Sequence, residues 1–239
     1  MKIFDYEITT ESFPFDYSSS NKTLIINTIN AYSFQVAKKD SEFKNALQNS
    51  DFLIPDGYGF KIAARILNNE RINKYSGYEL HKDILGFLNK TRGACFYFGS
   101  SKRTLELIKE HLILEYSNIK VDFYSPPFES EFTENENEVF LEKINSFHPD
   151  VLFIGLTAPK QEKWAIKNRN KIEAKYICSI GAVFDFYAGT VRKPNPLLVK
   201  IGLEWVSRFY NDPKHMIKRY KNFPVTSFLF DIFKFKIKI

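Results

Sequence analysis

The sequence predicts an α/β protein: a mostly parallel sheet with helices on both faces, followed by a basic C-terminal helical appendage. Two observations carry this prediction. Short apolar runs alternate along the chain with longer segments whose apolar residues recur at helical spacing. The short runs are continuously apolar, which is typical of parallel strands covered on both faces. With 239 residues, 44% of them hydrophobic, the chain is large enough for one sizeable core.

The first half of the chain is predicted to contain three strands, each followed by helical sequence. We expect strands at 23–28, 51–55 and 94–99. The first leads into a helical stretch that runs to Leu47, and the third into a helix over about 102–116. After the second strand, the apolar residues of YGFKIAARIL fall at helical spacing, and a further helix is expected near 78–89.

The second half is predicted to continue the same alternation. Strands are expected at 121–125, 150–156 and 175–184, with helices around 136–146 and from near Pro159 onward. The acidic segment ESEFTENENE (129–138) is interpreted as a solvated loop. We therefore assign residues 1–199 to the body and residues 200–239 to the appendage.

Glycines and polar residues gather at the carboxyl ends of the predicted strands. In chain order, the candidates are Thr28, Asn30, Asp56, Gly99, Ser100, Gly155 and Gln161. Ligands of open parallel sheets bind in the crevice beyond these strand ends. The sequence therefore predicts a ligand site at this edge of the sheet.

Asp56 is the candidate for acid–base chemistry. It lies between Pro55 and Gly57, directly after an apolar strand. Proline restricts the backbone there, and glycine lets a ligand approach it closely. A partly desolvated carboxylate in this place can act as a general base. The alternative is an aspartate that only caps the following helix.

Two further segments allow either a functional or a structural interpretation. Gly99-Ser100-Ser101 opens a helix, where free N–H groups suit a phosphate, although one of the serines could simply be the N-cap. Gln161 stands in the first turn of a helix, where it either has a purely structural role or faces the same crevice as Asp56. No dinucleotide fingerprint and no P-loop are present, which argues against an epimerase that needs a dinucleotide.

The net charge of the chain lies in its C-terminal end. Residues 200–239 hold nine Lys or Arg against three Asp or Glu, which equals the whole net charge of +6, and they contain nine aromatic residues. A neutral body with such an appendage indicates an anionic surface or polyanionic ligand as partner. A nucleic-acid- or partner-binding protein without catalysis is the competing interpretation. Because nucleic-acid binding leaves Asp56 and Gln161 without a role, we expect no nucleic-acid partner.

Composition also limits the compartment and the cofactors. No apolar run approaches the roughly 20 residues that span a bilayer, and the N-terminus is acidic where a secretory signal would be basic and apolar. We therefore expect a cytoplasmic protein. Cys95 and Cys178 lie in apolar runs and are expected to be buried, reduced thiols. The histidines show no metal-ligand spacing and no Asp-x-Asp pair follows a strand, so we expect neither a metal nor another cofactor.

Six blocks, in order, resemble the WecG/TagA/CpsF family of bacterial glycosyltransferases over about residues 20–224. The blocks are NTINAYSF, DFLIPDGYGFKIAARIL, KYSGYEL, GLTAPKQEKW, GAVFDFYAGTVRKPNP and GLEWVSRFYNDPKHMIKRY. The resemblance implies a Rossmann-like body and an inverting, metal-independent transfer from a UDP-sugar to a saccharide on a polyprenyl diphosphate such as undecaprenyl diphosphate. It places the protein peripherally on the inner face of the plasma membrane, in the synthesis of cell-surface polysaccharide such as capsule or teichoic acid. The donor sugar is expected to be of the N-acetylmannosamine type or a uronic acid.

The resemblance also implies roles for residues of the body. Asp56 matches the proposed catalytic base, Thr28 and Asn30 match polar residues that line the pocket, and Gln161 matches a glutamine beside the donor or acceptor sugar. Two positions depart from the family pattern. Lys74 replaces an arginine, which keeps the charge but loses bidentate phosphate binding. Thr157 replaces the second glycine of GLGxPxQE, a change expected to alter the loop and the donor preference.

The appendage is expected to have two parts. Arg208, Lys214, Lys218 and Arg219 fall in a segment, 202–221, that is expected to close over the diphosphate. Residues 225–239 are expected to contact the membrane, either as an interfacial helix or, because FKFKIKI alternates with period two, as an edge strand. The sequence leaves a homo-oligomer open.

Overall fold

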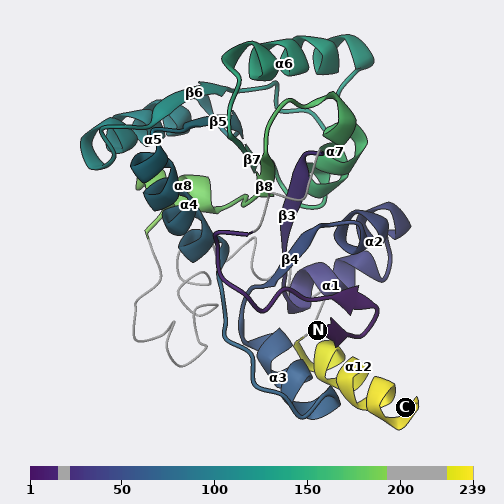
Figure 1. Ribbon diagram of the computed structural model, residues 1–239. Coiled ribbons are helices and arrows are strands. Elements are labelled where there is room, and N and C mark those ends of the chain that lie inside the picture. The colour runs from purple at the N-terminus through teal and green to yellow at the C-terminus, as the bar shows by residue number, and fades with distance from the viewer. Residues whose placement is uncertain (16–21, 193–224, 239) are drawn as a thin grey trace.

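The computed structural model describes residues 1–15, 22–192 and 225–238, and it confirms the α/β prediction. Six parallel strands form one sheet in the order β4-β3-β8-β7-β5-β6 (Figure 1). The strands are β3 (Leu24–Ile29), β4 (Phe52–Pro55), β5 (Ala94–Gly99), β6 (Lys120–Tyr124), β7 (Val151–Gly155) and β8 (Tyr176–Ser179). A separate two-stranded hairpin, β1 (Lys2–Ile3) and β2 (Tyr6–Glu7), opens the chain and has no counterpart in the predicted elements.

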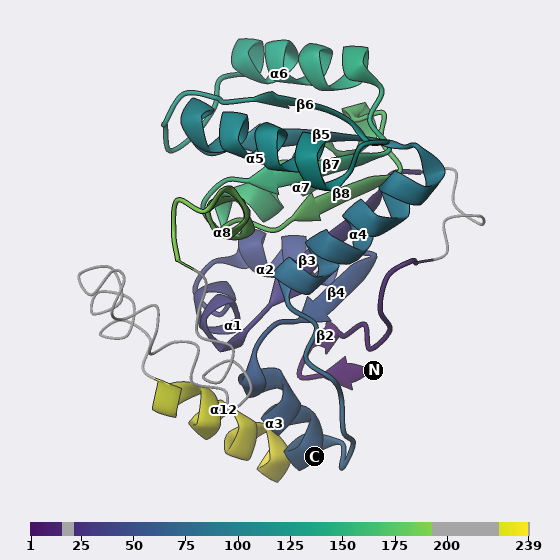
Figure 2. The same ribbon diagram turned by 90° about the vertical axis from the view of Figure 1, so that its left-hand side faces the viewer.

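Helices cover both faces of this sheet. In chain order they are α1 (Ala31–Ala37), α2 (Ser41–Gln48), α3 (Tyr58–Leu67), α4 (Gly77–Thr91), α5 (Lys102–Glu115), α6 (Glu134–Phe147), α7 (Lys160–Asn168), the 3-10 helix η1 (Arg169–Lys171), α8 (Val183–Ala188) and α12 (Val225–Lys238). Figure 2 shows α4, α5 and α8 in front of the sheet, whereas α1, α2, α6 and α7 lie on its other face. The β3 strand leads into α1 on one face, and its neighbour β8 leads into α8 on the other. A crevice opens where neighbouring connections diverge in this way.

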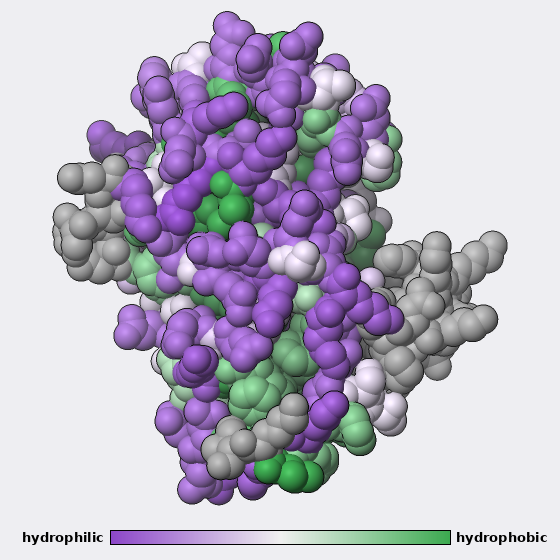
Figure 3. Space-filling model, turned by 90° about the vertical axis from the view of Figure 1, so that its right-hand side faces the viewer, coloured by the Kyte–Doolittle hydropathy of each residue, from purple (hydrophilic) through white to green (hydrophobic). Residues whose placement is uncertain are grey.

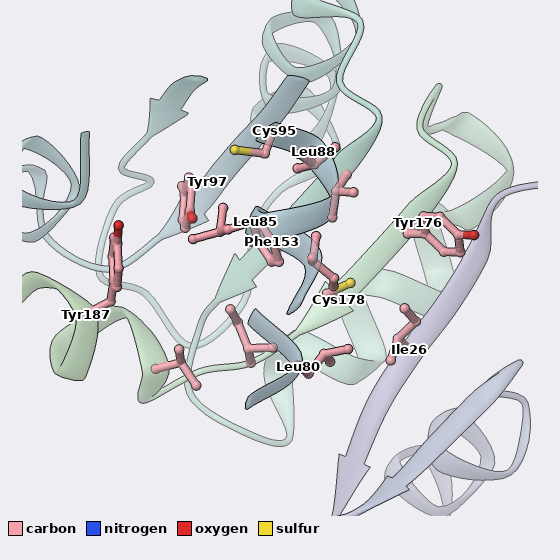
Figure 4. Close-up of a cluster of buried hydrophobic side chains, with 14 of the residues drawn as sticks. Ile26, Leu80, Leu85, Leu88, Cys95, Tyr97, Phe153, Tyr176, Cys178 and Tyr187 are labelled. Atoms are coloured by element: carbon pink, nitrogen blue, oxygen red, sulfur yellow. The ribbon is translucent and has the colours of Figure 1, made fainter. Parts of the chain in front are cut away.

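The continuously apolar strands contribute side chains to both faces. On β5, Cys95 and Tyr97 join the cluster under α4, α5 and α8, while Phe96 and Phe98 join the cluster under α6 and α7. Figure 4 shows part of the first cluster, in which Cys178 of β8 also lies. Both cysteines are buried and free, as expected. The chain thus builds a core on each side of a central sheet.

Several predicted boundaries were wrong for identifiable local reasons. The helical stretch to Leu47 is broken, because Asp40 accepts a hydrogen bond from the Phe43 N–H and caps a new helix, α2. The strand predicted at 175–184 ends at Ser179, because Gly181, with φ of +48°, turns the chain into α8. The acidic segment is a loop only at its start, since Thr133 caps α6.

The C-terminal segment is a helix, so the edge-strand alternative for residues 225–239 was wrong. One face of α12 packs on α1 and α3, with Phe228 and Ile232 only 2% and 0% exposed. Asp231 adds polar contacts with α1, through Lys38 Nζ at 2.6 Å and Gln35 Nε2 at 2.6 Å. This part of the appendage is therefore built into the body. No helix among the described residues is long and apolar enough to cross a membrane.

Candidate active site

Asp56 lies at the carboxyl ends of two paired strands. The Asp56 N–H donates to the Ile29 carbonyl across 2.8 Å, at the point where β3 and β4 end. Asn30 follows directly and is the N-cap of α1, with its Oδ1 accepting from the N–H groups of Tyr32 and Ser33. The N-cap of α3 is Gly57, so Asp56 stands one residue before the capping position. Asp56 is half-buried there beside Asn30.

The beginning of α4 approaches the same strand ends from the opposite face. Gly77 opens this helix, and a Cβ added to it would lie 3.8 Å from Thr28 Cγ2 and 3.4 Å from Val183 Cγ2. Two residues before Gly77, the Tyr75 N–H donates a hydrogen bond to the Pro55 carbonyl at 3.4 Å. Lys74 therefore lies next to the segment that carries Asp56, and its side chain is half-exposed. Thr28, Asp56 and Lys74 are brought together from three segments.

Gly99 and Ser100 make a tight turn between β5 and α5. Gly99 has φ of +120°, and a Cβ on it would meet the Gly155 carbonyl carbon and oxygen at 2.6 Å. The Ser100 N–H donates to that same Gly155 carbonyl at 3.1 Å. Ser101 is the N-cap of α5, accepting from the Thr104 N–H. Of the two serines, Ser101 therefore takes the capping role, and Ser100 lies beside the end of β7.

Close packing explains why residue 155 is a glycine. A Cβ added there would lie 2.4 Å from two ring carbons of Phe184 on α8. The nearby Thr157 is exposed and its φ is not in the left-handed region, so the replacement of the family's glycine introduces no backbone strain. The loop after β7 therefore accommodates threonine.

Gln161 and Glu162 lie in the first turn of α7 and are both buried, at 5% and 3% exposed. Gln161 Nε2 donates to Glu162 Oε1 at 2.9 Å. Desolvation raises the pKa of Glu162 to about 7. A glutamate in a first helical turn is ordinarily a surface residue that interacts with the helix dipole, so sequence reasoning missed its burial.

The remaining predicted site residues, Arg208, Lys218 and Arg219, together with Lys214, lie outside the described residues. Within the described part of the chain, no three His, Cys, Asp or Glu side chains gather as a metal site.

A hollow of about 500 Å³ lies at the opposite edge, near the amino ends of β3, β7 and β8. Its basic side chains are held in ion pairs, as Arg169 and Lys22 bind Asp51 and Lys175 binds Asp150 at 2.9 Å. These pairs have a structural role at the sheet edge. We therefore place the candidate site at the carboxyl edge, beside the segments that carry Thr28, Asp56 and Lys74.

Comparison with known proteins gives the family of the chain. The model of the Glycosyl transferase WecG/TagA/CpsF family matches residues 12–238. The chain belongs to this family. As a member of the WecG/TagA/CpsF family it is a glycosyltransferase, and the family expected from the six sequence blocks is confirmed.

Three curated relatives carry the name N-acetylglucosaminyldiphosphoundecaprenol N-acetyl-beta-D-mannosaminyltransferase. The protein of Bacillus subtilis strain 168 is 29% identical over 189 residues, which cover 79% of this chain and 72% of the relative. The protein of Staphylococcus aureus strain MRSA252 is 26% identical over 222 residues, or 93% and 84% of the two chains. That of Bacillus spizizenii strain W23 is 24% identical over 197 residues, or 82% and 75%.

Proposed function

We propose that this glycosyltransferase moves a sugar of the N-acetylmannosamine type from a UDP-sugar to a saccharide carried on a polyprenyl diphosphate. The names of the relatives support the acceptor class and the transferred sugar. The observation that carries the proposal is the hydrogen bond from the Asp56 N–H to the Ile29 carbonyl. It fixes the backbone of Asp56 next to the end of β3, the strand that carries Thr28 and leads into Asn30.

Asp56 serves as the general base of this reaction. Its carboxylate takes the proton from the attacking hydroxyl of the acceptor as that oxygen bonds to C1 of the donor sugar. The C1–O bond to UDP breaks on the opposite face, which inverts the configuration at C1. Thr28 and Asn30 line the pocket in which the two sugars meet.

Positive groups stabilise the departing diphosphate. The free N–H groups at the start of α5 and the Lys74 ammonium are suited to its negative charge. Arg208, Lys218 and Arg219 are proposed to close over it from the appendage. Gln161, beside Gly181, is proposed to contact one of the sugars.

The protein is proposed to meet its lipid-linked acceptor as a peripheral protein on the inner face of the membrane. The outer side of α12 exposes apolar side chains beside Lys234 and Lys236. The apolar ones are Leu229, Phe230, Phe233 and Ile237. Figure 3 shows hydrophobic surface at the lower end of the molecule, the end at which Figure 1 places α12. Aromatic and basic side chains together favour an interfacial position.

A donor panel tests the proposed function directly. The purified protein would be incubated with a set of UDP-sugars and a short prenyl diphosphate that carries N-acetylglucosamine, with UDP release and product mass as readouts. We expect UDP release that requires the acceptor and is strongest with UDP-N-acetylmannosamine. Absence of transfer from every UDP-sugar would contradict the proposal.

A further inference from the structure

Glu162 is buried without a counter-charge in the part of the chain that the structure describes. The residue is 3% exposed, and none of the ion pairs formed by the described residues includes its carboxyl. The next residue, Lys163, points instead to Asp40 and Glu42. A buried carboxyl without a cation destabilises the fold unless it is neutral or well hydrogen-bonded. Its burial on the inner side of α7 therefore calls for a reason other than stability.

Among the described residues, the side chain that is hydrogen-bonded to Glu162 is that of Gln161. One edge of its amide donates to Glu162 Oε1 at 2.9 Å. The amide also packs against Gly181, where an added Cβ would lie 3.3 Å from Oε1, 3.4 Å from Nε2 and 3.7 Å from Cδ. Gly181 sits in the turn between β8 and α8, at the crevice edge of the sheet. The amide therefore lies beside the turn that follows β8, at the carboxyl edge of the sheet.

The hydrogen bond to Glu162 gives the orientation of the amide. Its NH₂ edge faces Glu162 Oε1, which accepts this bond at 2.9 Å. The carbonyl oxygen, Oε1, is then left buried with no hydrogen-bond partner among the described residues. An unsatisfied buried acceptor is unfavourable. A ligand that brings an O–H or N–H to this point would satisfy it.

We propose that Glu162 is a positioning residue of the transfer reaction, which orients the Gln161 amide so that Oε1 accepts a hydrogen bond from a hydroxyl or amide N–H of the bound sugar. This inference rests on the proposed function, because it takes the crevice beside Gly181 to hold a sugar. The proposal also predicts which sugars the site accepts. A sugar without a donor at this point leaves Oε1 unpaired and is rejected, as sites built around a hydrogen bond reject analogues that lack it.

A double-mutant cycle tests the inference. The kcat and KM of the wild type would be compared with those of Gln161→Met, Glu162→Met and the double variant, with thermal unfolding as a check of the fold. Methionine keeps an unbranched chain but removes the hydrogen-bonding groups. We expect each single variant to lose about tenfold to a hundredfold in kcat/KM, and the double variant to lose no more than Gln161→Met alone.

Two further variants separate positioning from a general structural role. Glu162→Gln keeps a carbonyl acceptor for Gln161 and is expected to restore kcat/KM to within about threefold of the wild type. Glu138→Met, on the exposed side of α6, is the matched control and is expected to have no effect. Additive losses in the double variant, or full activity of a folded Glu162→Met, would overturn the inference. Absence of transfer by the wild type would instead contradict the proposed function, so the two failures are distinguishable.

Discussion

At the scale of single residues, the buried Glu162 carboxyl makes stability depend on pH. Its pKa is raised from 4.5 to about 7 by desolvation, so the folded state holds this proton more tightly than the unfolded state. The free energy of unfolding contributed by this group therefore falls as the pH rises from about 4.5 through about 7. Over that window the loss amounts to roughly 3 kcal/mol.

Glu162→Gln is expected to remove this pH dependence. The measurement is the free energy of unfolding by urea between about pH 5 and pH 8 for the wild type and the variant. The difference between them should grow in favour of the variant as the pH rises, because only the wild type must ionise a buried group. A difference that stays constant with pH would show that the carboxyl is not buried as described.

Gly155 and Gly86 allow a matched comparison, because a methyl group added at the first meets a neighbouring ring and at the second meets open space. Gly155→Ala is expected to destabilise the fold by about 1–3 kcal/mol, because the new methyl group would lie 2.4 Å from the Phe184 ring. Gly86→Ala, inside α4 with no atom within 4 Å of the added Cβ, is expected to stabilise by about 0.5–1 kcal/mol. Thermal or urea unfolding of both variants checks the prediction. Equal effects would contradict the close approach of α8 to the end of β7.

At the scale of elements, α12 has two sides with different expected roles. Its inner side belongs to a cluster of aromatic rings, in which Phe228 lies 5.3 Å from Phe34 and 5.7 Å from Phe60 between ring centroids. Phe228→Ala is expected to cost about 3–5 kcal/mol in the free energy of unfolding, as truncation of a buried phenylalanine does. A loss below about 1 kcal/mol, measured by urea unfolding, would show that α12 is not docked in this way.

The outer side of α12 carries the prediction for the membrane. Phe230 and Phe233 are 67% and 56% exposed, so replacing both with serine should leave the unfolding temperature nearly unchanged. Flotation with vesicles that contain anionic lipid should show weaker binding of this double variant, because an interfacial helix depends on its apolar face. Unchanged flotation would contradict a membrane contact through α12.

Point substitutions are better suited to this test than removal of residues 225–239. Phe228 packs against Gly59, where an added Cβ would lie 3.1 Å from its ring and 3.1 Å from the Cβ of Ala31 at the start of α1. Removing the helix would therefore uncover core near the segments that hold Asn30 and Asp56. In a truncated protein, flotation would not distinguish the loss of packing from the loss of membrane contact.

At the scale of the whole molecule, the sequence predicted the sheet because its strands carry a strong local signal. Continuous apolar runs such as ACFYFG become central strands, and the boundaries of α5 and β5 fall within a residue of the prediction. The two-residue strands of the N-terminal hairpin are too short to give such a signal. The strand predicted over GAVF (181–184) was wrong for another reason. This segment is as apolar as a strand, but Gly181 turns the chain into the helix α8.

The candidate site was predictable only in part. Parallel strands place their carboxyl ends at one edge, so the approach of Asp56 to Thr28 and Asn30 followed from topology. Gly155 and Gly99 were expected to bind substrate, yet the structure gives both a packing role that no sequence pattern reveals. The burial of Glu162 depends on where α7 meets the sheet, which is tertiary information.

The central claim is that Asp56, held beside Thr28 and Asn30, removes the proton from the acceptor hydroxyl. The most direct measurement is the single-turnover rate of sugar transfer by Asp56→Asn, with UDP affinity measured in parallel and Asp122→Asn, on the distant edge strand β6, as the control. Loss of a general base lowers the rate by roughly a hundredfold to ten-thousandfold. We predict such a loss for Asp56→Asn, with UDP binding close to that of the wild type and a normal rate for Asp122→Asn. A near-normal transfer rate in Asp56→Asn would contradict the account.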